Sequence, residues 1–311
     1  MSSSSAARRG LIQISLAGVL WGTGGLAVQL IRERVPMSVL TISAWRMGLA
    51  AVVLLAALLV LRQVPELRRL LRERPWTAIA VGLCTGAYQA LYFAAVVAVG
   101  VTVSTVVALG LAPVLLTVAE SVTARRLPNR KRVLVLTAAL GGLVLVSASA
   151  GLSVTGPQPI LGVLLAAASG SAYALATSLG RPLTKVTSPL ALTTVTSSAG
   201  AIGLLPLGLL ATGPHTSSDP EVIGLLVYLG VMTLAVAYGL LYAGLRTVLG
   251  SAAVVATLLE PVTAAVLAAV VLDERLGVLG IVGAALILVA VAGLEQDEGD
   301  DGLLPEGPAP L

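Results

Sequence analysis

Apolar stretches of about 20 residues recur along the whole of this 311-residue chain. Each stretch is long enough to cross the roughly 30 Å hydrocarbon core of a bilayer as one α-helix. Only 11% of the residues are charged, whereas a soluble domain carries about 25%. The sequence therefore predicts an all-α, polytopic membrane protein and excludes a water-soluble fold.

The apolar stretches predict ten transmembrane helices. They are expected at residues 11–31, 38–61, 76–98, 101–121, 133–151, 159–178, 189–212, 222–244, 249–272 and 276–294. The first follows two arginines, as a signal peptide would, but it is too long for one and no clear cleavage site follows it, so we expect it to be retained. Residues 1–10 and the acidic, proline- and glycine-rich residues 295–311 are expected to be disordered.

Lysine and arginine residues predict the orientation in the membrane. If the N-terminus is cytoplasmic, fifteen of the 19 lie in cytoplasmic segments, chiefly the loops 62–75 and 122–132, and three lie outside. This bias predicts ten spans with both termini in the cytoplasm, and we expect the membrane to be a bacterial plasma membrane. The net charge of +4 therefore reflects topology, and no nucleic-acid partner is expected.

The sequence lacks the residues needed for a disulfide, a metal cluster, a nucleotide-binding loop or a catalytic site. Cys84 and His215 are the only cysteine and the only histidine, which excludes an intrachain disulfide and a His/Cys metal cluster. No GxxxxGK[ST] phosphate loop occurs, and the spans offer no converging set of catalytic groups. We therefore expect no cofactor, no metal and no enzymatic activity, and a membrane enzyme or a scaffold is kept as an alternative function.

Two stretches of the first half recur in the second half in the same order. AYQALY (87–92) matches AYGLLY (237–242), and VVALGLAPV (106–114) matches VVATLLEPV (254–262). These matches predict a duplication into two repeats of five helices each. The predicted repeats are residues 11–151 and 157–294. Because five is odd, the second repeat must be inverted in the membrane relative to the first, a plan that recurs among secondary transporters.

The stretch LLEPVTAAVLAAVVLDERLG (258–277), together with Trp21–Gly22 and Trp45–Arg46, identifies a resemblance. With these residues the chain resembles the EamA-type transporters of the drug/metabolite transporter superfamily, which have ten helices in two five-helix repeats. The resemblance covers about residues 11–294.

Two stretches depart from the family's pattern. In PVLLTVAESVTARRL (113–127), arginines stand where the resemblance leads us to expect a glutamate, and in SGSAYA (169–174) no tryptophan stands where one is common. The family pattern therefore identifies the class of protein better than its substrate.

The resemblance implies a secondary transporter that works by alternating access around a site near the membrane midplane. Members of the family are known for exporting amino acids and other metabolites, and some move drugs or sugars. We therefore expect a small-molecule substrate, with export of amino acids or related metabolites first and efflux of drugs or toxins as the alternative. Protons are the candidate coupling ion, and the oligomeric state is left open.

Two ionisable residues are expected deep within the spans. Glu260 lies near the midplane, where a carboxylate must face the bundle interior and find a partner or take up a proton. Arg46 suits a carboxylate, either that of Glu260 or one on the substrate. The alternatives are a structural ion pair or a buried neutral carboxyl group that fixes helix packing for Glu260, and an outward-reaching side chain for Arg46.

Two prolines stand at corresponding positions of the repeats, Pro113 and Pro261. A proline within a helix leaves one carbonyl without its donor, which for Pro261 falls in the region of Thr257. Such a group is tolerated at membrane depth only where protein or water satisfies it. We therefore expect a helix break at each proline, and both spans are predicted to line a cavity.

Four tyrosines complete the candidate site as two i, i+4 pairs, each on one helix face. They are Tyr88, Tyr92, Tyr238 and Tyr242. Packing alone is an equal alternative for them. Trp21 and Gln89 are further candidates for substrate contact, with core packing and a helix–helix hydrogen bond as their alternatives. Glu120 and Glu274 lie at the ends of spans, where helix caps or loop contacts are expected.

Overall fold

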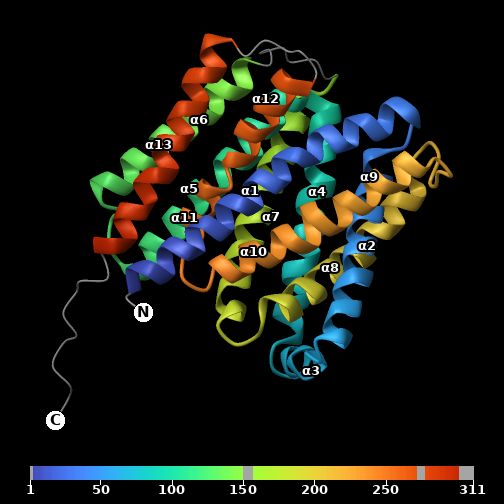
Figure 1. Ribbon diagram of the computed structural model, residues 1–311. Helices are drawn as coiled ribbons and strands as arrows, with labels where there is room; N and C mark the ends of the chain where they lie inside the picture. Colours follow the sequence, from blue (N-terminus) through green and yellow to red (C-terminus); the bar gives the residue numbers. More distant parts are fainter. Residues whose placement is uncertain (1–2, 150–156, 272–276, 301–311) are drawn as a thin grey trace.

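The computed structural model describes residues 3–149, 157–271 and 277–300, and every regular element within these ranges is a helix (Figure 1). The first repeat comprises α1 (Ser3–Arg34), α2 (Val39–Val60), α3 (Val64–Glu73), α4 (Pro75–Val99), α5 (Val101–Ala124) and α6 (Arg130–Ser149). The second comprises α7 (Pro159–Thr184), α8 (Pro189–Leu210), α9 (Pro220–Gly230), the π-helix η1 (Val231–Val236), α10 (Ala237–Gly244), α11 (Gly250–Ala256), α12 (Leu259–Val271) and α13 (Val278–Asp300).

Nine helical segments in the described residues are long and apolar enough to cross a membrane. Two of them combine several elements, because α9, η1 and α10 form one segment and α11 and α12 form another. A tenth apolar segment, Val278–Leu294, is shorter. These segments confirm an all-helical, polytopic membrane protein.

Local sequence signals start many of the helices. A proline occupies the first turn of α3, α4, α7, α8 and α9, where its missing N–H would have no partner in any case. The side chains of Ser38, Ser188 and Asp219 cap α2, α8 and α9 by accepting hydrogen bonds from backbone N–H groups of the first turn.

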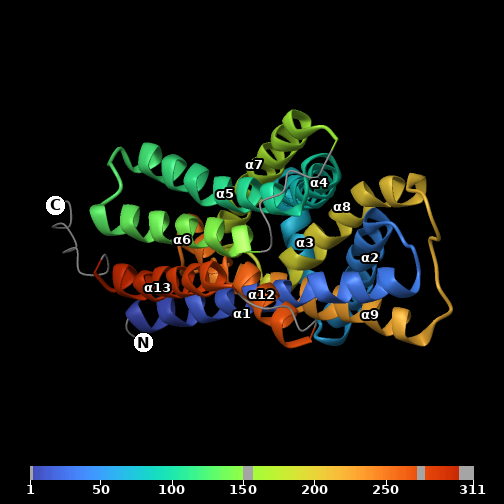
Figure 2. The ribbon, with the colours of Figure 1, turned by 90° about the horizontal axis from the view of Figure 1, so that it is seen from above.

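Helix contacts follow a pattern that relates the two repeats. Extensive contacts pair α4 with α7 and α8, α6 with α13, α2 with α8, and α1 with α10 and α12, while α5 packs on α7. Each contact has a counterpart when every helix is replaced by the corresponding helix of the other repeat. The contact of α4 with α7 then corresponds to that of α10 with α1, and the contact of α5 with α7 to that of α12 with α1. The contacts of α2 with α8 and of α6 with α13 each correspond to themselves. This is the twofold relation expected of inverted repeats. Seen from above, α6 and α13 lie side by side at one end of the bundle (Figure 2).

The contact between α6 and α13 depends on two glycines that face each other. A Cβ atom added to Gly142 would lie 2.6 Å from the Gly283 carbonyl oxygen, and one added to Gly283 would lie 2.7 Å from the Gly142 oxygen. Small residues allow such close backbone approach between helices in lipid.

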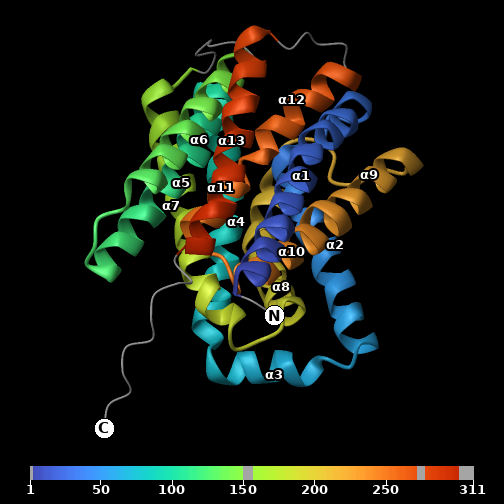
Figure 3. The same cartoon turned by 60° about the vertical axis from the view of Figure 1, so that its left-hand side comes forward.

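Two expectations about the ends of the chain were wrong for the residues that the structure describes. Residues 3–10 and 295–300 are helical rather than disordered, because α1 starts at Ser3 and α13 continues to Asp300. The start of α1 packs into the protein, where Ala7 is buried, and extending an existing helix costs little. The loop 62–75 contains the ten-residue helix α3, which lies across one end of the bundle (Figure 3).

The two prolines behave differently. Helix α5 continues through Pro113, so the break predicted there was wrong; one lost hydrogen bond does not interrupt a helix that its neighbours hold in place. The ninth span does divide, since α11 ends at Ala256 and α12 begins at Leu259. The Thr257 carbonyl is not left free, because it accepts the Glu260 N–H at 2.9 Å.

Candidate functional site

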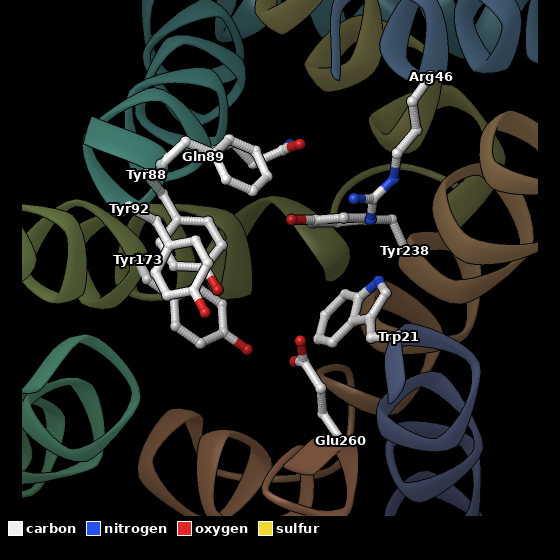
Figure 4. Close-up of a pocket in the computed structure, with 9 residues that line it drawn as sticks. Trp21, Arg46, Tyr88, Gln89, Tyr92, Tyr173, Tyr238 and Glu260 are labelled. Carbon is white, nitrogen blue, oxygen red and sulfur yellow. The ribbon is translucent and has the colours of Figure 1, made fainter. Parts of the chain in front are cut away.

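A cavity of about 80 Å³ lies between α1, α2 and α4 of the first repeat and α7, α10 and α12 of the second (Figure 4). It is lined by Trp21, Arg46, Tyr88, Gln89, Tyr92, Phe93, Tyr173, Tyr238 and Glu260. Its volume corresponds to roughly five to eight water molecules. Seven of the eight residues predicted as a site therefore meet in one cavity, although they come from five helices.

Two aromatic pairs form facing parts of the cavity wall. The rings of Tyr88 and Tyr173 stack with centroids 5.0 Å apart, and the rings of Trp21 and Tyr238 lie at the same centroid distance. Tyr88 and Tyr238 are repeat-related, and Trp21 and Tyr173 come from the first helix of each repeat. The twofold relation of the fold thus extends to the site.

Tyr173 and Phe93 were not predicted as site residues. Tyr173 belongs to SGSAYA, the stretch in which no tryptophan was found, and its hydroxyl group lies 3.2 Å from Thr257 Oγ1. Tyr173 holds the position in the second repeat that Trp21 holds in the first, so a comparison of the repeats could have identified it as a site residue. Phe93 is the only phenylalanine of the chain, and nothing in the sequence distinguished it from a packing residue.

The second member of each tyrosine pair has a different environment. Tyr92 lines the cavity, and its hydroxyl group lies 2.7 Å from Thr105 Oγ1. Tyr242 does not line it: its side chain is only 2% exposed and packs against Gly180, where an added Cβ would lie 3.2 Å from the ring. The structure therefore places Tyr242 in the core, as the packing alternative expected.

Arg46 reaches the cavity next to the π-helix η1. One terminal nitrogen of its guanidinium donates to the Thr233 carbonyl oxygen at 3.2 Å. That oxygen would normally accept the N–H of Ala237, which instead donates to the carbonyl oxygens of Met232 and Leu234. The π-helical turn thus presents a backbone acceptor to the arginine, a use of π-helices that is frequent at functional sites.

Glu260 points into the cavity from the wall opposite Arg46 (Figure 4). In the described part of the chain, no ion pair within 4.0 Å joins the two side chains. A direct pair between them was one of the expected arrangements. The two side chains instead face the cavity from different sides.

Two glycines of α1 bring Trp21 next to the divided ninth span. A Cβ atom on Gly22 would lie 2.5 Å from the Glu260 carbonyl oxygen, and one on Gly18 would lie 3.1 Å from the Thr257 oxygen. The glycines are four residues apart and share one helix face. This close approach of backbones positions Trp21 and Glu260 in the same cavity.

Several buried polar atoms around the cavity have no hydrogen-bond partner. Among the described residues, five buried side-chain atoms lack one, and four of them belong to cavity residues: Trp21 Nε1, Arg46 Nε, and both amide atoms of Gln89. Most buried polar atoms in proteins are paired, so each exception needs an explanation. Here the unpaired donors and acceptor line one cavity, which is the arrangement expected of a site that binds a polar molecule.

A second polar cluster joins the repeats where α5, α6 and α11 meet. Arg132 donates to Glu120 Oε2 and to the Ser251 hydroxyl group. The Ser251 N–H and hydroxyl group donate to the Glu120 carboxylate at 3.1 and 2.6 Å. Glu120 thus pairs with Arg132 and accepts an N–H from the first turn of α11, so it joins three helices instead of making the cap or loop contact expected at the end of its own span. Glu274 lies outside the described residues.

Replacing Glu120 with alanine is expected to destabilise the protein by about 1.5–3 kcal/mol, because Arg132 and Ser251 lose a charged acceptor in a partly buried place. The thermal midpoint in detergent should fall by several degrees. Glu73→Ala is the matched control, since its ion pair with Arg69 is exposed and such pairs contribute little. Equal shifts for both variants would contradict a structural role for this cluster.

Comparisons with known proteins agree with this architecture. A solved crystal structure matches 93% of this chain and 96% of its own with a TM-score of 0.73, and at 22% identity this likeness shows the fold alone. An uncharacterized transporter of Bacillus subtilis (strain 168), YwfM, is 28% identical over 280 residues, which are 89% of this chain and 90% of that protein. The sequence pattern of the EamA-like transporter family matches twice, once over residues 8–148 and once over residues 160–295. Since the two matches cover most of both repeats, the chain belongs to the EamA-like transporter family.

Proposed function

We propose that this transporter moves small zwitterionic metabolites, with free amino acids as the leading substrate class. The observation that carries the proposal is the set of unpaired polar atoms around a small cavity. A substrate carboxylate would bind beside Arg46, where a guanidinium can donate two hydrogen bonds. A substrate ammonium group would lie toward Glu260, on the opposite side of the cavity.

The aromatic rings of the cavity suit the rest of such a substrate. Tyrosine and tryptophan rings offer apolar faces with polar groups at their edges, so they accept a short side chain without excluding the charged groups. The cavity volume of about 80 Å³ is well below the roughly 300–1,000 Å³ of sites for drug-sized ligands. Its size favours a small metabolite over the alternative of drug or toxin efflux.

Alternating access is the mechanism that we propose for this site. The cavity is built from both repeats, so a movement of one repeat against the other would change which side of the membrane it faces. Secondary transport of this kind needs no nucleotide-binding site. Export as the direction rests on the resemblance to family members that export amino acids.

The substrate class can be tested with purified protein in liposomes. Uptake of a labelled small amino acid should be inhibited by other small amino acids. The matching amine without the carboxylate, and the matching acid without the amino group, should each need at least about a tenfold higher concentration for the same inhibition. Tyr242→Phe, outside the cavity, is the control for general damage to the protein. Equal inhibition by amine, acid and amino acid would contradict zwitterion recognition, and transport of drugs alone would favour the efflux alternative.

We also propose that both termini lie in the cytoplasm of a bacterial cell, with the protein in the plasma membrane. The start of α1, the end of α13 and α3 lie toward the same end of the bundle (Figures 1 and 3), and the arginine-rich loops predict that this end is cytoplasmic.

Cysteine labelling tests this orientation in a Cys84→Ser background. A cysteine at Glu73, in α3, is expected to react with an impermeant thiol reagent only after the membrane is opened. A cysteine at Ser218, between α8 and α9, should react in intact cells. Labelling of the Glu73→Cys variant in intact cells would overturn the proposed topology.

A further inference from the structure

The helix α3 has one face packed on the bundle and one face turned away from it. Leu70 is buried and Leu67 packs against the same core. The helix contacts α8 and α4, and the Gln63 side chain next to it accepts a hydrogen bond from the Ser188 hydroxyl group at 2.9 Å. These contacts hold α3 in a fixed position across the end of the bundle (Figure 3).

The outer face of α3 is strongly basic. Residues 62–75 contain five arginines and two glutamates, a net charge of +3. Arg69 pairs with Glu73 at 2.9 Å. Arg68 and Arg72 are exposed, four residues apart and therefore on one side of the helix, and within the described residues neither makes an ion pair within 4.0 Å. With the exposed Arg62 and Arg74 they form what we call the α3 surface.

Exposed apolar residues border the α3 surface on both sides. Leu61, at the end of α2, is 60% exposed, and Trp76, in the first turn of α4, is 81% exposed. Exposure on this scale suits contact with lipid, and tryptophan is enriched where acyl chains meet headgroups. Leu61 and Trp76 flank α3 in the sequence, so the arginines of the α3 surface lie between two exposed apolar side chains.

We propose that the α3 surface binds the headgroups of anionic phospholipids. A cluster of four or more arginines next to a transmembrane helix attracts anionic lipid, and a helix with one packed face and one basic face lies in the plane of the membrane surface. Lipid phosphates would bind Arg68 and Arg72, while Leu61 and Trp76 contact the acyl chains. The partner is therefore a lipid surface rather than a soluble acidic protein.

The full-length protein in nanodiscs provides the test. Phosphatidylglycerol added to phosphatidylcholine discs should raise the thermal midpoint of the wild type. In the Arg68→Gln/Arg72→Gln variant, the half-saturating fraction of phosphatidylglycerol should rise by about fivefold for each arginine removed. The control is Arg125→Gln/Arg126→Gln, which removes the same charge from exposed positions after α5. An equal loss in the control would overturn the proposal, because the effect would then be one of general charge.

A second measurement keeps all the arginines of the α3 surface in place and follows Trp76. Brominated phosphatidylglycerol at a low fraction should quench the fluorescence of Trp76 more than brominated phosphatidylcholine does at the same fraction, with Trp76→Phe giving the background from the other tryptophans. Equal quenching by both lipids would contradict a preference for anionic lipid at α3. An acidic polyglutamate peptide, tested on the protein in neutral discs, distinguishes the other kind of partner. If the peptide binds only when Arg68 and Arg72 are present, and anionic lipid has no effect, the surface binds a protein instead.

Discussion

The Arg46→Met variant is expected to lose transport by about 100-fold or more while it remains folded. Removing one partner of a buried, hydrogen-bonded charge pair costs about 2–5 kcal/mol, and each 1.4 kcal/mol is roughly tenfold in affinity. Under the proposed function, the partner of Arg46 in this pair is the carboxylate of the substrate. Within the protein, the Arg46 side chain has one hydrogen bond, to Thr233, and its Nε atom has no partner, so its removal leaves little of the fold unsupported.

Uptake into proteoliposomes measures this effect, with the thermal midpoint and elution profile as checks on folding. Arg46→Lys should give intermediate transport, because a lysine keeps the charge but lacks the planar fork of donors. Tyr242→Phe should remain close to wild type, since its hydroxyl group is outside the cavity. Transport by Arg46→Met within a few-fold of the wild type would show that Arg46 has a structural role only.

The double variant Arg46→Met/Glu260→Gln separates two arrangements of these residues. If the side chains were ion-pair partners, each single replacement would leave a buried charge uncompensated, and the double replacement would destabilise the protein less than either single one. Since the described residues contain no such pair within 4.0 Å, we expect the two changes in thermal midpoint to add. A clear rescue in the double variant would contradict this.

Most of the cavity could be predicted from the sequence because polar residues are costly in lipid. Glu260, Arg46 and Gln89 stood out against apolar spans, and the membrane environment leaves such side chains few places other than an interior cavity. The repeat then related Tyr88 to Tyr238. Neither inference needed the three-dimensional structure: the first rests on the cost of polar groups in lipid, and the second on the internal repeat.

The features that were missed depend on packing, which local sequence does not encode. Aromatic residues pack well in any core, so Phe93 could not be recognised as a cavity residue and Tyr242 could not be excluded. Pro113 and Pro261 each remove one backbone hydrogen bond from their helix, yet only the span of Pro261 divides. Contacts with neighbouring helices decide whether the weakened turn opens. The π-helical turn that offers the Thr233 carbonyl to Arg46 likewise has no sequence signal that we could identify.

The Glu260→Gln variant is expected to exchange substrate for substrate but to lose its response to a pH gradient. Glu260 is the one carboxyl group among the residues that line the cavity, so a transported proton has no other acidic side chain there to bind. Proton binding and substrate binding at adjacent groups are linked, with equal and reciprocal effects on affinity. Glutamine resembles the protonated acid in shape but cannot release a proton, which separates transport from coupling.

An imposed gradient makes the difference measurable. One pH unit supplies about 1.4 kcal/mol for each coupled proton, so the wild type should reach roughly tenfold accumulation in proteoliposomes at steady state, whereas the variant should reach none. Counterflow of labelled substrate against unlabelled substrate, measured without a gradient, is the control. It should persist in both proteins, with a weaker apparent affinity in the variant because glutamine keeps an acceptor for the substrate ammonium group but loses the charge. Its loss in the variant would mean that Glu260 is needed for binding or folding rather than for coupling. If the variant instead accumulates substrate as the wild type does, Glu260 is not the coupling group, and the proton, if one is carried, must bind elsewhere.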